Sequence, residues 1–332
     1  MFKKYWIVLI LIAMLAASVT SILQTPWFST VILRRMLAAR PGVVVKTVVI
    51  KSQQFSLPGH FQFRNVRLVL QFEGKELTFE TPELDVSGLQ QWLGVDRRFL
   101  VGVEHAKVSY DTGAVDDLTA QFTVVPQGAS GPVGAVQCRW DKWQAGDISA
   151  FLILNRTGLE VRALSFNAYD GHLTGKLMVR IDTPPLKYTG EIFTEGLNVA
   201  KLADVNPGIT QQLDGTVTGT VSVGGDVHAL QVLDASLVMP SGGNISASLL
   251  AALTQYLPAS REKKRLDALI NSGGKLGMEL FSFTIKGGQQ GRFAGELHLR
   301  SREVNLELNL THEINTDGTI ASLVGYWQKF VQ

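Results

Sequence analysis

Beyond Pro41, apolar and polar residues alternate with a period of two along most of the chain. Successive side chains of a β-strand point to opposite faces, so this alternation predicts strands with one apolar and one polar face. In the segment LDGTVTGTVSV at 213–223, the valines fall on one face and the threonines and serine on the other. Turn pairs such as Asp170-Gly171 separate the runs. The pattern predicts roughly 18 strands with short connections.

Strands with such short connections exclude a parallel sheet of βαβ units, because parallel neighbours need a long crossover. The sequence therefore predicts a mainly β protein: a sandwich, a barrel or an elongated meander. A lipid-exposed barrel does not fit, because the strands keep a polar face and outer-membrane barrels need aromatic girdles. A helical insert is predicted at 246–272, where leucines recur at helical spacing until Gly273-Gly274. A lid, a partner surface and a cap on the sheet edge all remain open for this insert.

The best internal linker is PQGASGPV at 126–133, which is rich in glycine and proline. It divides the β region into residues 41–125 and 134–332. In the first part, the alternation through Phe61 and Phe63 changes phase at Asn65, which predicts a β-bulge. Asp116 and Asp117 are predicted to lie in a solvated loop.

Residues 5–33 contain no Asp, Glu, Lys or Arg. At a rise of about 1.5 Å per residue, Tyr5–Leu23 reaches about 28 Å and predicts a transmembrane anchor at 1–24. Thr25-Pro26 then predicts the start of a juxtamembrane helix at 25–40. A cleaved secretory leader with its site at 19–21 is the alternative, and the apolar run beyond that site favours the anchor. The expected membrane-anchor residues are Tyr5, Trp6, Ile7, Leu23, Trp27 and Phe28.

Positive charge is concentrated near the N-terminus. Nine of the 31 bases precede the first acid, Glu73, which leaves 22 bases against 29 acids in the remainder. Bases beside a membrane span attract anionic lipid head groups, although help with insertion or solvation of a strand face explains them equally well. The expected head-group contacts are Arg34, Arg35 and Arg40. We expect no nucleic-acid partner, and we expect the long C-terminal part to be exported.

Catalytic and metal-binding motifs are missing from the sequence. The histidines have no ligand spacing, and there is no nucleophile elbow or phosphate-binding glycine loop. We therefore expect no enzymatic activity, no cofactor and no metal. Cys138 is the single cysteine, so no intramolecular disulfide forms, and we expect a structural thiol rather than a reactive one. Trp140 and Trp143 are expected in core or edge packing, with membrane or lipid contact as the alternative.

The order of these features resembles the AsmA-like family of bacterial envelope proteins. The likeness begins with the anchor and short helix and continues through PGVVVKTVVIKSQQFSLPGHFQFRNVRLVL, ELTFETPELDVSGLQQWLG and VGVEHAKVSYD. The segment FNAYDGHLTGKLMVRIDTPPLKYTGEIFTEGLNVAKL is similar to the family's C-terminal module. The resemblance implies an elongated, U-shaped antiparallel β-sheet, with one N-terminal transmembrane helix, a few short helices and an apolar groove that shields acyl chains.

The resemblance also implies a single-pass protein of the bacterial inner membrane whose bulk lies in the periplasm. Its implied role is lipid transport between inner and outer membranes, or envelope integrity. The implied partners are phospholipid, the inner membrane and a periplasmic or outer-membrane protein. The alternative is a structural or assembly factor of the envelope, such as a secretion-system subunit or a helper of outer-membrane protein assembly.

Apolar side chains on the predicted strands are the candidate groove lining. Taken from the alternation alone, they favour the filling of a closed core, whereas the resemblance favours a partly open groove. The candidates are Phe61, Phe63, Leu68, Leu70, Phe79, Val108, Leu177, Val179, Phe283, Leu297 and Leu306.

Overall fold

The computed structural model describes residues 25–38, 43–56, 59–72, 74–88, 97–180, 182, 185–204, 212–226, 229–254, 259–287, 292–301 and 306–315. The predicted membrane span Tyr5–Leu23 and the predicted head-group contact Arg40 lie outside these residues. Within them, no helix has both the length and the apolar character that crossing a membrane requires. The chain is mainly β and divides into two compact units, unit 1 (Met1–Asp141) and unit 2 (Lys142–Gln332).

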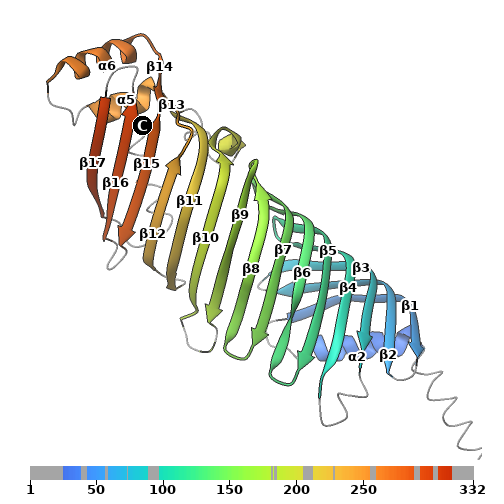
Figure 1. Ribbon diagram of the computed structural model, residues 1–332. Helices are drawn as coiled ribbons and strands as arrows, with labels where there is room; N and C mark the ends of the chain where they lie inside the picture. The colour runs from blue at the N-terminus through green and yellow to red at the C-terminus, as the bar shows by residue number, and fades with distance from the viewer. Residues whose placement is uncertain are drawn as a thin grey trace, which may run out of the picture. The chain divides into compact units, whose positions relative to one another are not determined.

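Unit 1 is an antiparallel sheet in which each strand pairs with the next one along the chain. Its strands are β1 (Val43–Ser56), β2 (His60–Phe72), β3 (Lys75–Ser87), β4 (Phe99–Tyr110), β5 (Gly113–Val125) and β6 (Gly128–Trp140) (Figure 1). Helix α2 (Pro26–Ala38) lies within the predicted juxtamembrane segment and packs against β1. Alternating apolar residues form these strands as predicted.

The segment predicted as a linker at 126–133 is instead the turn after β5 and the first part of β6. Its glycine content has a packing cause. A Cβ atom on Gly131 would lie 1.9 Å from the carbonyl oxygen of Gln121, so only glycine allows β5 and β6 to approach this closely. The compositional signal therefore marks close strand contact rather than a flexible connection.

Asp116 and Asp117 also differ from the prediction, because both lie inside β5 and not in a loop. Asp116 accepts hydrogen bonds from the bases of the two neighbouring strands, and Asp117 pairs with His105 on β4. A strand interior tolerates two carboxylates here because cations on the flanking strands face them.

Unit 2 continues the same pattern of antiparallel pairing between consecutive strands. These strands are β7 (Trp143–Asn155), β8 (Gly158–Ala168), β9 (Gly171–Arg180), β10 (Lys187–Asn198), β11 (Leu213–Asp226) and β12 (Leu230–Met239). Strand β12 then pairs with β15 (Leu280–Gly287), which continues to β16 (Arg292–Ser301) and β17 (Leu306–Asn315).

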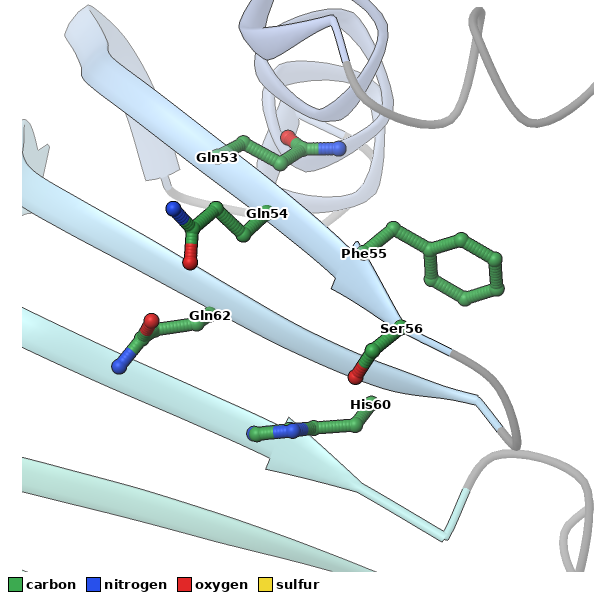
Figure 2. Close-up of a pocket in the computed structure, with 6 residues that line it drawn as sticks. All are labelled: Gln53, Gln54, Phe55, Ser56, His60 and Gln62. Carbon is green, nitrogen blue, oxygen red and sulfur yellow. The ribbon is translucent and has the colours of Figure 1, made fainter.

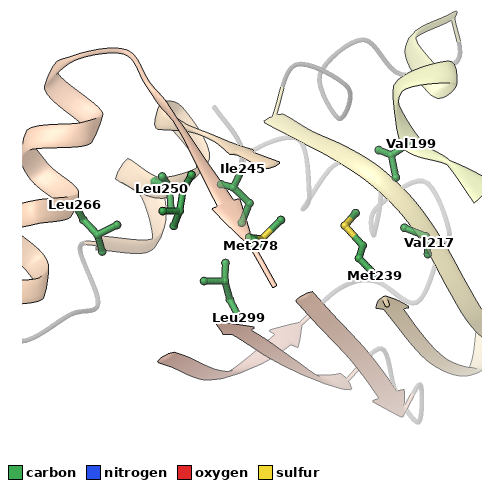
Figure 3. Packing of buried hydrophobic residues seen from close by; sticks show 9 residues of the cluster. Val199, Val217, Met239, Ile245, Leu250, Leu266, Met278 and Leu299 are labelled. Atoms are coloured by element: carbon green, nitrogen blue, oxygen red, sulfur yellow. The ribbon is translucent and has the colours of Figure 1, made fainter. Parts of the chain in front are cut away.

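The segment between β12 and β15 forms a compact cap on unit 2. It contains the paired strands β13 (Gly243–Ser246) and β14 (Lys275–Met278) and the helices α5 (Ala247–Thr254) and α6 (Arg261–Asn271), which occupy the predicted insert. Leu250 of α5 and Leu266 of α6 are each 1% exposed and share a core with Met239 and Leu299 (Figure 3). The short 3-10 helix η1 (Val199–Asp204) adds Val199 to this core. This packing supports the interpretation of the insert as a cap.

Candidate functional site

Strand register aligns the apolar residues of unit 1 in rows that run across the sheet. One row joins Leu68, Phe79, Val108, Val115 and Cys138 through consecutive strand pairs. The neighbouring row joins Phe63, Leu84, Val103, Ala120 and Val133. We call the side of the sheet that carries these rows the apolar face of unit 1. Many of its side chains are half-buried, including Phe79, Val86, Val101 and Phe122.

A change of phase in mid-strand keeps the apolar residues on this face. Phe63 and Val66 are three positions apart on β2, yet both belong to one buried cluster, and the intervening Asn65 has a positive φ of 51°. Val103 and Ala106 of β4 repeat this arrangement around His105, whose φ is also 51°. A residue with left-handed backbone angles interrupts the strict alternation of a strand. Side chains at odd-numbered positions before it and at even-numbered positions after it then lie on the same side of the sheet.

The phase change predicted at Asn65 is therefore present, but the β-bulge predicted there is not. The register passes from Arg64↔Glu83 to Val66↔Thr81 without a shift. Strand β3 changes phase at the same level, at Pro82. The residues Asn65, Pro82, His105 and Asp117 thus form a line across the strands, which we call the crease.

Pro82 interrupts the hydrogen bonding of β3, because proline has no backbone N–H group. A side-chain hydroxyl provides hydrogen bonds to the backbone at this point. Thr81 is 3% exposed, and its hydroxyl lies 2.8 Å from the carbonyl oxygen of Glu104 on β4. The same hydroxyl lies 2.7 Å from the carbonyl oxygen of Glu83 and accepts a hydrogen bond from the Glu83 N–H. Thr81 therefore replaces the missing part of the strand ladder.

His105 and Asp117 form an ion pair along the crease. The distance from His105 Nδ1 to Asp117 Oδ1 is 2.5 Å. The hydrogen bond to Asp117, together with its charge, raises the pKa of His105 above the ordinary value of 6.5. Both residues are exposed, so this pair faces the solvent rather than the apolar face.

The opposite side of unit 1 is polar and carries cross-strand ion pairs. Asp116 on β5 lies between Lys107 on β4, at 3.2 Å, and Arg139 on β6, at 2.8 Å. Hydrogen bonds from Lys107 and then Arg139 hold the pKa of Asp116 below its usual range. One side of the sheet of unit 1 is therefore suited to contact with water, and the other side is suited to contact with apolar groups.

The single cysteine belongs to the apolar face. Cys138 lies opposite Val115 and is half-buried. Burial raises the pKa of its thiol, which keeps the sulfur protonated at neutral pH and lowers its nucleophilicity. This environment supports the structural role expected for Cys138.

Unit 2 presents an apolar face of its own. One row joins Val161, Leu177, Gly190, Val223 and Leu233. Leu237, Phe283 and Leu297 form another row across β12, β15 and β16. Ile285 and Phe293 are each 3% exposed and belong to a cluster with Leu230 and Ala235. We call the side that carries these rows the apolar face of unit 2.

Ten of the predicted groove residues fall on these two faces. Phe61, Phe63, Leu68, Leu70, Phe79 and Val108 share the face of unit 1. Leu177, Val179, Phe283 and Leu297 share the face of unit 2. Leu306 is described only through its backbone pairing with Ser301.

Other residues of the apolar faces were not among the predicted groove residues. In unit 1 these are Leu84, Val86, Val101, Val103 and Phe122. Their signal in the sequence is a step of three residues between two runs of alternation, as from Val103 to Ala106. A strict period of two would assign the apolar residues in the two halves of such a strand to opposite faces of the sheet. The full rows can therefore be recognised only from the register in which the strands pair.

The predicted membrane contacts that the structure describes lie on α2. Trp27 is 71% exposed, while Phe28 is half-buried. Arg34 and Arg35 are exposed, and Leu33 packs against the cluster around Ile50. Tyr5, Trp6, Ile7 and Leu23 lie outside the described residues. One side of helix α2 thus packs against the sheet, while Trp27 and the two arginines are exposed to solvent.

Trp140 and Trp143 lie at strand ends and not in a core. Trp140 is 52% exposed, and its ring covers Gly113, whose added Cβ would meet the ring at 2.5 Å. Trp143 is 55% exposed and contacts Tyr169 edge to face, with ring centroids 6.1 Å apart. Both indoles therefore cover neighbouring turns of their own unit.

Among the residues that the structure describes, two open hollows lie on the sheet surfaces. The first, of about 430 Å³, is at the β1–β2 hairpin and is lined by Gln53, Gln54, Phe55, Ser56, His60 and Gln62 (Figure 2). Its lining is mostly polar, with His60 Nε2 3.0 Å from Asp85 Oδ1. The second, of about 330 Å³, crosses β8 to β12 near Gly224, where Met178 and Val232 are exposed. Neither is a deep enclosed pocket, so the extended apolar faces are the candidate site.

Comparison of the chain with protein-family models, curated proteins and solved structures gives no match. The geometry of the two units therefore carries the functional argument.

Proposed function

We propose that the chain is an AsmA-like protein of the bacterial envelope that binds phospholipid acyl chains on its apolar faces. In this proposal each face is the wall of a U-shaped groove, and the N-terminal run anchors the protein in the inner membrane. Its role is lipid transport between the two membranes or maintenance of the envelope.

The observation that supports this proposal is the set of apolar rows, which contain half-buried side chains beside buried ones. A closed core would cover these side chains, whereas Phe79, Val101 and Val108 on unit 1 keep part of their surface accessible. Helix α2 packs on β1, at the edge of this face. Acyl chains are suitable occupants, because each buried methylene contributes about 0.8 kcal/mol without any need for a specific polar partner.

Photocrosslinking tests the proposal with probes on opposite faces of one strand. A benzophenone side chain at Val108 lies on the apolar face, and the same probe at the adjacent Lys107 lies on the polar face. We expect lipid adducts from position 108 in cells and few from position 107, measured by mass spectrometry of the purified protein. Leu177 and Lys176 provide the same pair in unit 2. Equal labelling from both faces, or no lipid adduct at 108 and 177, contradicts acyl-chain binding.

A role as an envelope assembly factor is the second candidate, favoured by the exposed first strand. Val44 and Val49 of β1 are 59% and 42% exposed. Exposed strand edges accept strands of partner proteins by backbone pairing. Crosslinking from position 44 in cells distinguishes the two functions, since an assembly factor yields one stoichiometric protein adduct there and no lipid adduct at 108.

A further inference from the structure

Helix α6 carries a cluster of bases on its solvent-facing side. Arg261, Lys264 and Arg265 are spaced at i, i+3 and i+4, which places them on one side of the helix, and all three are exposed. The other side packs into the core of unit 2 through Leu266, with Leu269 and Ile270 beside it. We call the three bases the basic face of α6.

No ion pair joins a base of this face to an acidic side chain among those that the structure describes. The sheet of unit 2 behaves differently, since Lys176 lies 2.7 Å from Glu191 and Arg300 lies 3.5 Å from Glu279. The positive charge of the α6 face is therefore available to an external anion, whereas these two sheet bases are already paired.

The position of the bases along α6 is unfavourable for the helix itself. Ser260 caps the helix, and its hydroxyl accepts a hydrogen bond from the Lys263 N–H at 3.1 Å. The N-terminal end of a helix carries partial positive charge, which repels a cation in the first turn such as Arg261. The helix dipole therefore gives no reason for a base at this position, whereas an anionic partner does.

We propose that the basic face of α6 docks on an anionic phospholipid surface. Figure 1 shows α6 at one end of unit 2, beside β14 and away from the middle of the sheet. Lys275, exposed at the start of β14, follows the helix directly and adds to the positive charge. Clustered Lys and Arg side chains on an amphipathic helix bind anionic head groups, because the attraction of each charge adds to the others. Sequence-specific recognition of nucleic acid requires in addition a motif that contacts the nucleobases.

A probe on α6 tests this docking in the full chain. Ala268 is exposed and lies seven residues after Arg261, on the same side of the helix. An environment-sensitive fluorophore is attached to Ala268→Cys in a Cys138→Ser background, with the protein held in neutral phosphatidylcholine nanodiscs. Vesicles that contain about 30% phosphatidylglycerol should shift the emission to the blue at low salt, and added salt should reverse the shift.

Charge reversal provides the decisive comparison. The triple change Arg261→Glu, Lys264→Glu and Arg265→Glu should weaken vesicle binding at least about a hundredfold, since each base near an anionic surface contributes about fivefold. The matched control reverses three exposed bases elsewhere in unit 2, namely Lys142→Glu, Arg156→Glu and Lys187→Glu. This control should bind as the parent does, although its net charge changes equally.

Milder variants keep the proposal testable if the triple change affects folding. Lys264→Gln and Arg265→Gln should each weaken binding severalfold, with unchanged circular dichroism. An equal blue shift with pure phosphatidylcholine vesicles, or equal weakening by the control triple, overturns the proposal. A larger salt-dependent shift with a DNA duplex also overturns it. None of these outcomes affects lipid adducts at positions 108 and 177, so acyl-chain binding is judged separately.

Discussion

Phe79 and Leu84 lie five residues apart on β3, a spacing that puts two side chains on opposite faces of a regular strand, yet both pack against the cluster of Val103 and Ala106. Pro82 and the neighbouring Thr81 make this possible by changing the phase of the strand between them. Both halves of the strand thus contribute to one apolar face, which doubles the length of apolar contact that β3 supplies.

The hydroxyl of Thr81 should be essential for the stability of the crease. We expect Thr81→Val to lower the free energy of unfolding by about 1–3 kcal/mol, because the change keeps the side-chain shape and leaves buried backbone groups without a partner. Chemical denaturation followed by tryptophan fluorescence measures the effect. Thr119→Val, on an exposed position of β5, is the control and should change stability by less than about 0.5 kcal/mol. Equal effects of the two changes would disprove the role of Thr81.

The ion pair of His105 and Asp117 should make the stability of unit 1 depend on pH. Because the pKa of His105 is raised in the folded state, the pair stabilises fully below about pH 6.5, and this contribution is lost as the pH rises through the folded value. Asp117→Asn should move the pKa of His105 down towards 6.5 in an NMR titration. Asp116→Asn is the matched control, since Asp116 faces Lys107 and Arg139 instead. A His105 titration unchanged by Asp117→Asn rules out this coupling.

Cys138 should react slowly with thiol reagents in the folded protein. Its raised pKa and partial burial lower both the thiolate fraction and the access of a reagent. At about pH 8 we expect labelling at least about tenfold slower than in denaturant, followed by absorbance with a disulfide reagent. A folded rate equal to the denatured rate would show that the thiol is not sheltered by the apolar face.

Two glycines of unit 2 should respond differently to the same substitution. A Cβ on Gly175 would lie 2.3 Å from the carbonyl oxygen of Glu191, so Gly175→Ala should destabilise by about 1–3 kcal/mol. A Cβ on Gly190 would lie 3.4 Å from Leu177 Cδ1, a contact that the side chain can accommodate, and Gly190→Ala should stay within about 0.5 kcal/mol. Thermal unfolding of the two variants beside the parent checks this order, and the reverse order would contradict the strand geometry.

Much of the fold could be predicted from the sequence, because alternation with a period of two is a local property of each strand. The helical insert was also visible, since its leucines follow the helical period. The linker prediction at 126–133 failed because glycine marks both flexible segments and close strand contacts, and only the approach of Gln121 to Gly131 distinguishes them. The loop prediction for Asp116 failed because its cations come from β4 and β6, which the sequence does not place beside it.

The candidate site could be predicted only in part. Ten of the eleven chosen side chains fall on the two apolar faces, because each lies within a run of regular alternation. The crease could not be predicted in full, since its four members share no residue type. They lie beside one another on neighbouring strands, and this position depends on the register in which the strands pair.

Strands that pair with their neighbours in the chain give unit 1 a simple way to change in size. In unit 1, β3 contacts β2 and β4 and takes its register from them alone. The insertion or loss of two adjacent strands would therefore leave every other pairing intact, as in a repeat protein. Evolution can thus widen or narrow such a sheet by whole hairpins, and the width of the sheet becomes a trait that varies independently of its chemistry.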